Sequence, residues 1–269
     1  MNFASKVAWI TGASSGIGAA LAREFAARGG HVVLSGRDEA RLAEVAASLP
    51  TESLVLPFEV RDDAAMADAN AKAIGWRGGV DMAVANAGVS QRAIALKTDM
   101  QVYRDIIAID LTQQIAFSQG LIGHMAERGS GALLFISSIA GKVGVPLRTA
   151  YCAAKFGLAG YADALRAELS QSGVSVHVIY PGSVATDVAR NALTAHGEKR
   201  GRSDKAIDEG IPVDEAARTM LDGVANGERE IIVARGMELA MGEARRTPEA
   251  LFDQVAAMVA AGYIEKMEG

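Results

Sequence analysis

The sequence predicts an α/β fold, in which a doubly wound, parallel sheet of seven strands carries helices on both faces. Short apolar runs alternate along the chain with amphipathic stretches, which is the pattern of βαβ units around a buried parallel sheet. No proline- or serine-rich linker, repeat or low-complexity tract divides the chain, so residues 1–269 are expected to form one domain.

The order of the elements follows from this alternation. Seven apolar runs are expected as strands: Lys6–Thr11, His31–Gly36, Ser53–Phe58, Met82–Ala85, Ala132–Ser137, Ser175–Tyr180 and Glu230–Ala234. Six amphipathic stretches are expected as helices: Gly16–Arg28, Glu39–Ser48, Asp63–Ile74, Val102–Arg128, Thr149–Ser172 and Asp214–Asn226. Right-handed crossovers would place these helices on both faces of the sheet.

Two segments interrupt or extend this order. Residues 187–210 are polar and follow the sixth strand, so they are either a solvated loop or a mobile lid over a site at the carboxyl ends of the strands. Loops of this length in compact domains are usually functional or disordered, which favours the lid. Residues 237–269 form a C-terminal extension.

Composition excludes several classes of function. The chain has 27 Lys and Arg against 32 Asp and Glu, a net charge of -5, which argues against nucleic acid or an anionic membrane as a partner. The single cysteine, Cys152, and the four histidines show no metal-ligand spacing, so no metal is expected. Without a signal peptide or a membrane-spanning stretch in the sequence, a cytoplasmic location is expected.

The first strand runs into a glycine-rich turn, Thr11-Gly12-Ala13-Ser14-Ser15-Gly16-Ile17-Gly18, directly before the first helix. Glycines at this spacing allow a tight turn and a close approach of the backbone to a pyrophosphate, while the helix N-terminus supplies N–H groups. The turn therefore predicts dinucleotide binding, although a plain strand-to-helix connection has the same elements.

The second strand ends in Gly36-Arg37, near the place where NAD-binding units carry an acid for the adenosine ribose. Without a carboxylate to repel a 2'-phosphate, and with a guanidinium to bind it, NADP(H) is favoured over NAD(H). The alternative is that Arg37 is solvated and that Asp38 is only an N-cap.

Tyr151 and Lys155 lie one helical turn apart at the start of the fifth expected helix. An ammonium beside a phenol favours the phenolate, so this pair could serve as a general acid and base. Ser138, at the end of the fifth strand, could donate a hydrogen bond to a carbonyl oxygen, or it could merely cap nearby backbone. Pro181-Gly182 ends the sixth strand and exposes backbone groups near Val184 and Thr186, which taken alone is only a turn.

These motifs, taken in order with Asn86-Ala87-Gly88, resemble those of the short-chain dehydrogenase/reductase family from about Lys6 to Thr186. The resemblance implies a Rossmann fold and hydride transfer between NAD(P)(H) and a carbonyl or alcohol. It implies that Tyr151 is the general acid/base, that Lys155 favours the phenolate and holds the nicotinamide ribose, and that Ser138 polarises the carbonyl. The expected cofactor-binding residues are Gly12, Ser14, Ser15, Gly16, Ile17, Gly18, Arg37, Glu59, Val60, Asn86, Ala87, Gly88, Tyr151, Lys155, Pro181, Gly182, Val184 and Thr186.

Three positions depart from the family pattern. Asp110 stands where the family usually has an asparagine of a proton relay; we expect it at the catalytic site, where it either keeps the relay or holds Lys155 too tightly. Glu59-Val60 replaces the usual Asp-Val at the adenine, and Ala85-Asn86 replaces Asn-Asn. The stretch from Gly210 to Val233 resembles the dehydrogenase/reductase member 7 subgroup, some of whose members are membrane-anchored; this chain is expected to be a soluble relative.

The expected function is NADP(H)-dependent reduction of a carbonyl, or oxidation of a secondary alcohol, on a small and largely hydrophobic substrate. The apolar stretch Val143-Gly144-Val145-Pro146-Leu147 either lines the substrate pocket or is a packed loop. A non-catalytic dinucleotide sensor, suggested by Asp110, and an epimerase or dehydratase on the same scaffold remain alternatives. The family resemblance also implies a homodimer or homotetramer.

Overall fold

The computed structural model of the chain describes residues 1–245 and 247–262. At its centre is a parallel sheet with the strand order β3-β2-β1-β4-β5-β6-β7. The strands are β1 (Val7–Thr11), β2 (His31–Ser35), β3 (Ser53–Val55), β4 (Met82–Ala85), β5 (Gly131–Ile136), β6 (Val174–Pro181) and β7 (Glu230–Val233). The chain changes direction across the sheet between β1 and β4, so the carboxyl ends of these two strands flank the crevice in which such sheets bind ligands.

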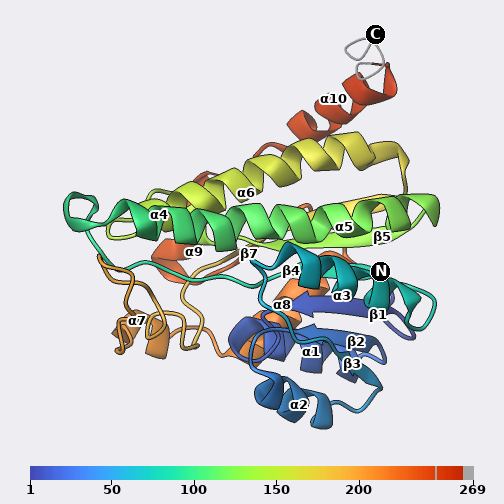
Figure 1. Cartoon of the computed structure of the whole chain (residues 1–269). Coiled ribbons are helices and arrows are strands. Elements are labelled where there is room, and N and C mark those ends of the chain that lie inside the picture. Colours follow the sequence, from blue (N-terminus) through green and yellow to red (C-terminus); the bar gives the residue numbers. More distant parts are fainter. Residues whose placement is uncertain (246, 263–269) are drawn as a thin grey trace.

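Helices cover both faces of the sheet, and the predicted α/β fold is confirmed (Figure 1). One face carries α1 (Gly16–Ala27), α2 (Glu39–Ala47) and α8 (Val213–Ala225), and the other carries α3 (Asp63–Gly75), α4 (Met100–Ile107), α5 (Gln113–Glu127) and α6 (Thr149–Glu168). The shorter elements are η1 (Ala95–Lys97), η2 (Ala108–Thr112), η3 (Ile139–Gly141), η4 (Leu169–Gln171), α7 (Lys205–Asp208), α9 (Gly236–Ala244) and α10 (Glu249–Ala260). None of the described helices is both long and apolar enough to cross a bilayer.

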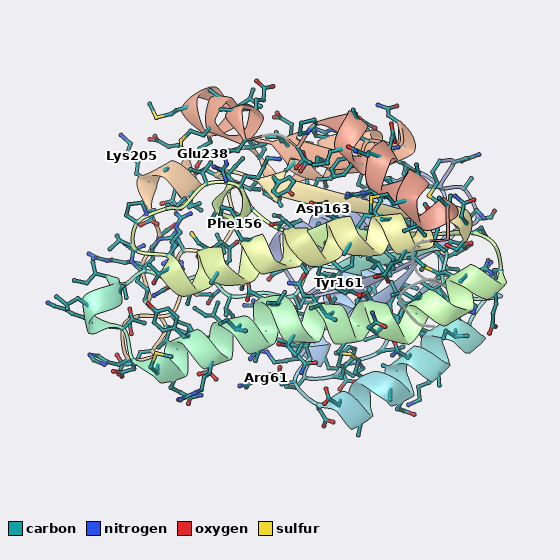
Figure 2. The ribbon with its side chains drawn as sticks, turned by 90° about the horizontal axis from the view of Figure 1, so that it is seen from above. Arg61, Phe156, Tyr161, Asp163, Lys205 and Glu238 are labelled. Atoms are coloured by element: carbon teal, nitrogen blue, oxygen red, sulfur yellow. The ribbon has the colours of Figure 1, made fainter. Side chains whose placement is uncertain are left out.

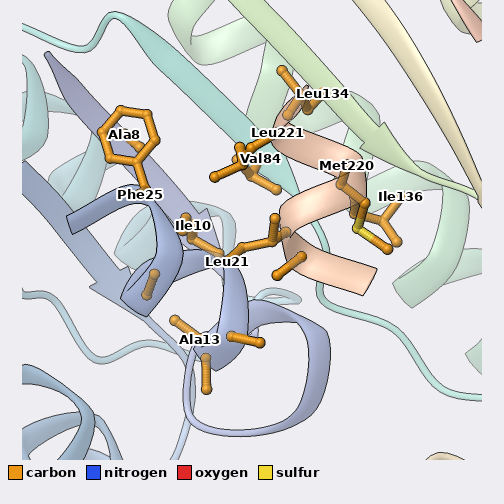
Figure 3. Close-up of a cluster of buried hydrophobic side chains, with 14 of the residues drawn as sticks. Ala8, Ile10, Ala13, Leu21, Phe25, Val84, Leu134, Ile136, Met220 and Leu221 are labelled. Atoms are coloured by element: carbon orange, nitrogen blue, oxygen red, sulfur yellow. The ribbon is translucent and has the colours of Figure 1, made fainter. Parts of the chain in front are cut away.

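The core is two-sided because successive residues of a strand point to opposite faces. In β1, Ala8 and Ile10 pack toward α1 and α8, whereas Val7 and Trp9 pack toward α3, α5 and α6. Figure 3 shows the first of these layers, formed by side chains of the sheet and of two helices: Ile10, Leu21, Phe25, Val84, Leu134, Ile136, Met220 and Leu221. Burial of each large side chain of this kind contributes about 1.5–3 kcal/mol, so the layer fixes α1, and with it the turn that precedes α1.

The structure corrects two expectations about element bounds. The helix expected over Val102–Arg128 is divided into α4 and α5 by one π-helical turn, η2. The third strand ends at Val55 rather than Phe58, although Leu56 and Phe58 still donate backbone hydrogen bonds to Leu34 and Gly36. The segment 187–210 contains α7, and the C-terminal extension contains α9 and α10; residues 246 and 263–269 of that extension lie outside the described residues.

Candidate active site

Tyr151 and Lys155 lie on the first two turns of α6, on the side that faces the end of β5. The Lys155 ammonium lies 5.6 Å from the centre of the Tyr151 ring and donates a 2.9 Å hydrogen bond to the carbonyl oxygen of Ile136. Lys155 is buried, whereas Tyr151 is only half-buried. The pair therefore combines a fixed positive charge with a phenol that a ligand can reach.

Asp110 completes this arrangement from the π-helical turn. Its Oδ2 lies 3.2 Å from Lys155 Nζ, and its Oδ1 accepts a 2.8 Å hydrogen bond from the backbone N–H of Val89. Complete burial raises the pKa of the Asp110 carboxyl above its ordinary value, although the Lys155 charge and the Val89 hydrogen bond act in the opposite direction. A π-helical turn, which is common at functional sites, thus carries a buried carboxylate to the lysine.

Gly88 allows this close approach. A Cβ atom on Gly88 would lie 2.9 Å from Asp110 Oδ2, closer than real Cβ contacts. Gly88 is one of the expected cofactor-binding residues, and the structure gives it this packing role beside the Asp110 carboxylate.

Ser138 lies in the turn after β5, and this turn packs directly on α6. The neighbouring Ser137 hydroxyl donates a 3.1 Å hydrogen bond to the carbonyl oxygen of Lys155. The Ser138 hydroxyl donates to the carbonyl oxygen of Pro181 at 3.3 Å and accepts from the N–H of Ala140 at 3.1 Å. The structure therefore brings Ser138, Tyr151, Lys155 and Asp110 together above the ends of β4 and β5.

The glycine-rich turn between β1 and α1 has the shape that a dinucleotide phosphate requires. Gly12 and Gly16 have positive φ angles of 65° and 53°, which only glycine adopts at little cost. A Cβ on Gly18 would collide with the carbonyl oxygen of Gly12. Ser15, at the N-cap of α1, makes no side-chain capping hydrogen bond, so the first N–H groups of this helix are left to an anion.

Asn86 and Thr11 hold this turn against β4. The Asn86 side-chain amide donates to the carbonyl oxygens of Thr11 and Gly12 at 2.8 and 3.3 Å. The Thr11 hydroxyl accepts hydrogen bonds from the backbone N–H groups of Asn86 and Ala87 at 3.0 and 3.1 Å. Gln114, which the sequence reasoning missed, donates a 2.8 Å hydrogen bond to the carbonyl oxygen of Ala87. The Asn86-Ala87-Gly88 segment thus holds the glycine-rich turn between β1 and α1 in place.

Arg37 follows the end of β2, where the sequence predicts the adenosine ribose. Its side chain is 68% exposed, and its guanidinium lies 3.5 Å from a carboxylate oxygen of Glu59. A Cβ on Gly36 would lie 3.6 Å from the Ser14 hydroxyl, so Ser14 packs beside the residue that precedes Arg37. Ile17 and Val60, also expected at the cofactor, pack with the hydrophobic clusters on the two faces of the sheet.

The segment after β6 closes the other side of the crevice. Thr186 approaches the glycine-rich turn closely, because a Cβ on Gly16 would lie 3.4 Å from its methyl group. Val184 is buried and forms a β-bridge with Ile211. Pro181 accepts the hydrogen bond from Ser138 described above. The segment after β6 therefore lies against the glycine-rich turn at Thr186 and Gly16.

Glu238 of α9 supports this segment, and no sequence signal pointed to it. Its two carboxylate oxygens accept hydrogen bonds from the backbone N–H of Ser183 at 2.7 Å and from the Ser183 hydroxyl at 2.9 Å. A side chain on Gly182 would collide with this carboxylate. In Figure 2 Glu238 and the α7 residue Lys205 lie at the same end of the molecule, near the start of α6.

The segment 187–210 is held against the loop that follows β4. Leu193 exchanges backbone hydrogen bonds with Ser90 and Arg92 at 2.8 and 2.9 Å, and Asp99 pairs with His196 at 3.0 Å. Arg92 also pairs with Asp204 at 2.8 Å. In this structure the segment lies beside the site, and its mobility stays a prediction.

The site can perform acid–base chemistry beside a bound dinucleotide. The phosphates of NAD(P)(H) fit three features of the site: the glycines that have no room for a side chain, the first N–H groups of α1 and the exposed Arg37 guanidinium. Within the described residues, no group of three or more His, Cys, Asp or Glu side chains is placed to bind a metal ion.

Comparisons with known proteins point to one family. Residues 6–196 match the family model described as short chain dehydrogenase. Dehydrogenase/reductase SDR family member 7B of Danio rerio is 34% identical over 242 residues, which cover 87% of this chain and 78% of the relative. The family protein 7-like of Drosophila melanogaster is 33% identical over 239 residues, which cover 85% of this chain and 72% of that protein.

Solved structures share the fold. A short-chain dehydrogenase from Sphingobium yanoikuyae in complex with NADPH has a TM-score of 0.76 at 26% identity, over 84% of this chain and 87% of that one. A short chain dehydrogenase/reductase from Burkholderia phymatum in complex with NAD has a TM-score of 0.81 at 21% identity, over 92% and 98% of the two chains.

Proposed function

This chain belongs to the short-chain dehydrogenase/reductase family, and on that premise we propose that it is an NADP(H)-dependent oxidoreductase that interconverts a carbonyl compound and a secondary alcohol. The observation that carries the proposal is the half-buried phenol of Tyr151 beside the buried ammonium of Lys155, with Ser138 on the adjoining turn. When bound, the nicotinamide supplies or accepts the hydride.

The residues of the site divide the remaining work. The Ser138 hydroxyl has one proton, so when substrate binds it turns from the Pro181 carbonyl oxygen, 3.3 Å away, and donates to the substrate oxygen. Together with Tyr151 it then holds that oxygen in place. The Tyr151 hydroxyl gives its proton to this oxygen during reduction and takes it back during oxidation. Lys155 stabilises the phenolate that remains, because its ammonium lies on the same side of α6.

A preference for NADP(H) is supported by the corner at the end of β2. Gly36 offers no carboxylate to the ribose, and the exposed Arg37 guanidinium can bind a 2'-phosphate with two parallel hydrogen bonds. The Sphingobium structure was solved with NADPH and the Burkholderia structure with NAD, so the preference rests on Gly36 and Arg37 of this chain. Glu59 opposes it, since its carboxylate already lies near Arg37.

The substrate is proposed to be largely hydrophobic. Tyr151 packs with the side chains of Val89, Tyr103 and Leu193 against the apolar cluster formed by α4 and α6. These side chains come from three different segments and supply apolar surface beside the phenol.

A homodimer or homotetramer is also proposed, formed through the outer faces of α5 and α6. Figure 2 looks onto these two helices, which run side by side. Phe156 of α6 is 38% exposed on this part of the molecule, and an aromatic side chain of this kind is commonly covered by a partner.

The direct test is a turnover screen. NADPH or NADH is incubated with the purified protein and a panel of aldehydes and ketones, and the loss of absorbance of the reduced nicotinamide is followed. We expect turnover of apolar ketones with NADPH. Tight NADPH binding without turnover of any compound would instead favour a dinucleotide sensor, and conversion without net NADPH consumption would favour an epimerase or dehydratase.

A further inference from the structure

Two arginines are brought side by side next to Tyr151 by hydrogen bonds between their neighbours in sequence. The backbone N–H of Ala93 donates to the carbonyl oxygen of Leu147 at 3.0 Å, and the N–H of Ala150 donates to the side-chain oxygen of Gln91 at 2.8 Å. These two bonds join the loop after β4 to the start of α6. Arg92 and Arg148 lie between the bonded residues, one on each segment.

Arg92 is firmly fixed. Its side chain is only 7% exposed, and its Nε donates to Asp204 of the 187–210 segment at 2.8 Å. A second nitrogen donates to the Ser90 hydroxyl at 2.9 Å and to the carbonyl oxygen of Gln91 at 2.8 Å. Arg200 also pairs with Asp204, so a single carboxylate is shared by two guanidinium groups.

Arg148 adds a third positive charge, and the carboxylate that acts on it, Asp204, already pairs with Arg92 and Arg200. It is half-buried at the N-cap of α6, one turn before Tyr151, and its side chain makes no hydrogen bond or ion pair with any described residue. Burial lowers the pKa of its guanidinium, and the charge of Arg92 lowers it further. A cation withdrawn from water without a partner is unfavourable, and a bound anion would offset this.

The phosphates of the cofactor are not this anion. They are expected at the glycine-rich turn after β1 and at Arg37 after β2, whereas α6 follows β5. In the strand order, β2 and β5 lie on opposite sides of the β1–β4 pair. The Arg92–Arg148 pair therefore lies near Tyr151 and away from the strand end that carries Arg37.

We propose that Arg148, with Arg92 beside it, binds an acidic group of the substrate. The substrate class is then a carbonyl compound or alcohol that carries a carboxylate or phosphate at the other end of an apolar chain. The side chains of Val89, Tyr103 and Leu193 pack against the same apolar cluster as Tyr151 and would supply the apolar surface for such a chain. This inference rests on the proposed function, because it names the substrate of the same site.

The test compares acids with their neutral counterparts. A series of oxo-acids of increasing chain length, their methyl esters and the matching oxo-alkyl phosphates are assayed with NADPH. Arg148→Gln is compared with wild type and with Arg202→Gln, which removes an exposed charge from the 187–210 segment that also carries Asp204. For the wild type we expect a higher kcat/KM with an oxo-acid than with its methyl ester. Whether the oxo-acids or the oxo-alkyl phosphates have the higher kcat/KM shows which acidic group the site binds.

In Arg148→Gln we expect kcat/KM for the preferred acid to fall about 10- to 100-fold, because a charge-assisted hydrogen bond is lost, and the loss should appear as a higher KM. The kcat/KM for the ester should change less than about threefold. Arg148→Lys should recover part of the loss, and Arg202→Gln should behave as wild type. Equal values for acid and ester in the wild type, or an equal loss of both in Arg148→Gln, would overturn the inference and leave the oxidoreductase intact.

A binding measurement separates this inference from the proposed function. Saturated carboxylates and alkyl phosphates of the same chain lengths, which carry no carbonyl, are titrated into the protein with NADPH present. We expect binding that Arg148→Gln weakens about 10-fold or more. Such binding would support the site even if no compound were reduced, and its absence from the wild type would overturn it.

Discussion

The Asp110 carboxylate and the Lys155 ammonium form an ion pair of 3.2 Å at a depth where neither side chain is exposed by more than 3%. Lys155 also donates to the Ile136 carbonyl oxygen at 2.9 Å. An ammonium has three donors, so one remains for the phenol of Tyr151 or for a bound ribose. The ion pair therefore fixes Lys155 without using up all of its hydrogen-bonding capacity.

The first prediction concerns the stability of Asp110→Asn as a function of pH. Because burial raises the pKa of Asp110, the folded protein holds this proton to a higher pH than the unfolded chain does. The free energy of unfolding of the wild type should therefore lose a contribution as pH rises from about 4, by about 1.4 kcal/mol for each unit by which the pKa is raised. The asparagine variant has no such titration.

Urea unfolding of both proteins between pH 4 and 7 checks this. We expect the difference in free energy of unfolding to change steadily in favour of Asp110→Asn as pH rises. Asp68→Asn, which neutralises an exposed carboxylate of α3, serves as the control and should show little change. A difference that is constant with pH, or one that moves toward the wild type, would show that Asp110 does not have a raised pKa.

The second prediction concerns Arg37→Ala. Removal of the guanidinium takes away the group that would bind a 2'-phosphate, so we expect KM for NADPH to rise about 10- to 100-fold and KM for NADH to change less than about threefold. Steady-state kinetics with both cofactors measure this, with Arg41→Ala of α2 as an exposed control. Equal losses for NADPH and NADH would remove the argument for NADP(H).

The third prediction concerns Glu238→Ala, which removes a residue that positions the segment after β6. Loss of its two hydrogen bonds to Ser183 should loosen the segment after β6, and we expect the dissociation constant of NADPH to rise about 10-fold. Glu243→Ala removes an exposed carboxylate from the same helix and should leave NADPH affinity unchanged. Fluorescence titration of NADPH measures both variants. The role assigned to Glu238 fails if its removal lowers the melting temperature alone.

The fourth prediction concerns the buried pair of Lys142 and Glu230. Their side chains are 3% and 2% exposed and lie 2.9 Å apart, just beyond the turn that holds Ser138. Lys142→Met would leave the Glu230 carboxylate without a cation, although Tyr180 and Thr247 still donate to it, and should cost about 3 kcal/mol of stability. Denaturant unfolding of Lys142→Met and of Lys142→Met/Glu230→Leu tests this. We expect the double variant to be the more stable, and the reverse order would contradict the account.

The sheet was predictable because its strands are short apolar runs between turns. Residues 82–85 were predicted with the bounds that the structure has, because they form an apolar run with a polar residue at each end. All four are buried in the structure. The division of the long helix at Ala108–Thr112 was not predictable, because one wider turn barely changes the spacing of its apolar residues.

The residues proposed for catalysis were visible in the sequence because they lie in short, ordered motifs. Ser138, Tyr151 and Lys155 span fewer than twenty residues, and Asp110 was found as a departure from the family pattern. Glu238 and Arg148 were missed because their roles depend on long-range contacts. Glu238 binds a residue 55 positions away, and the segment of Arg148 is joined to a loop about as far away.

The most direct test of the central claim is the Tyr151→Phe variant, which removes one hydroxyl and keeps the ring. With NADPH and the best ketone of the screen, we expect kcat to fall about 10²- to 10⁴-fold, while the dissociation constant of NADPH changes less than about threefold. Tyr161→Phe on the same helix, whose hydroxyl contacts Ser118 and Gln119, should keep its activity. A Tyr151→Phe enzyme that turns over at the wild-type rate would contradict the assignment of Tyr151 as the proton donor.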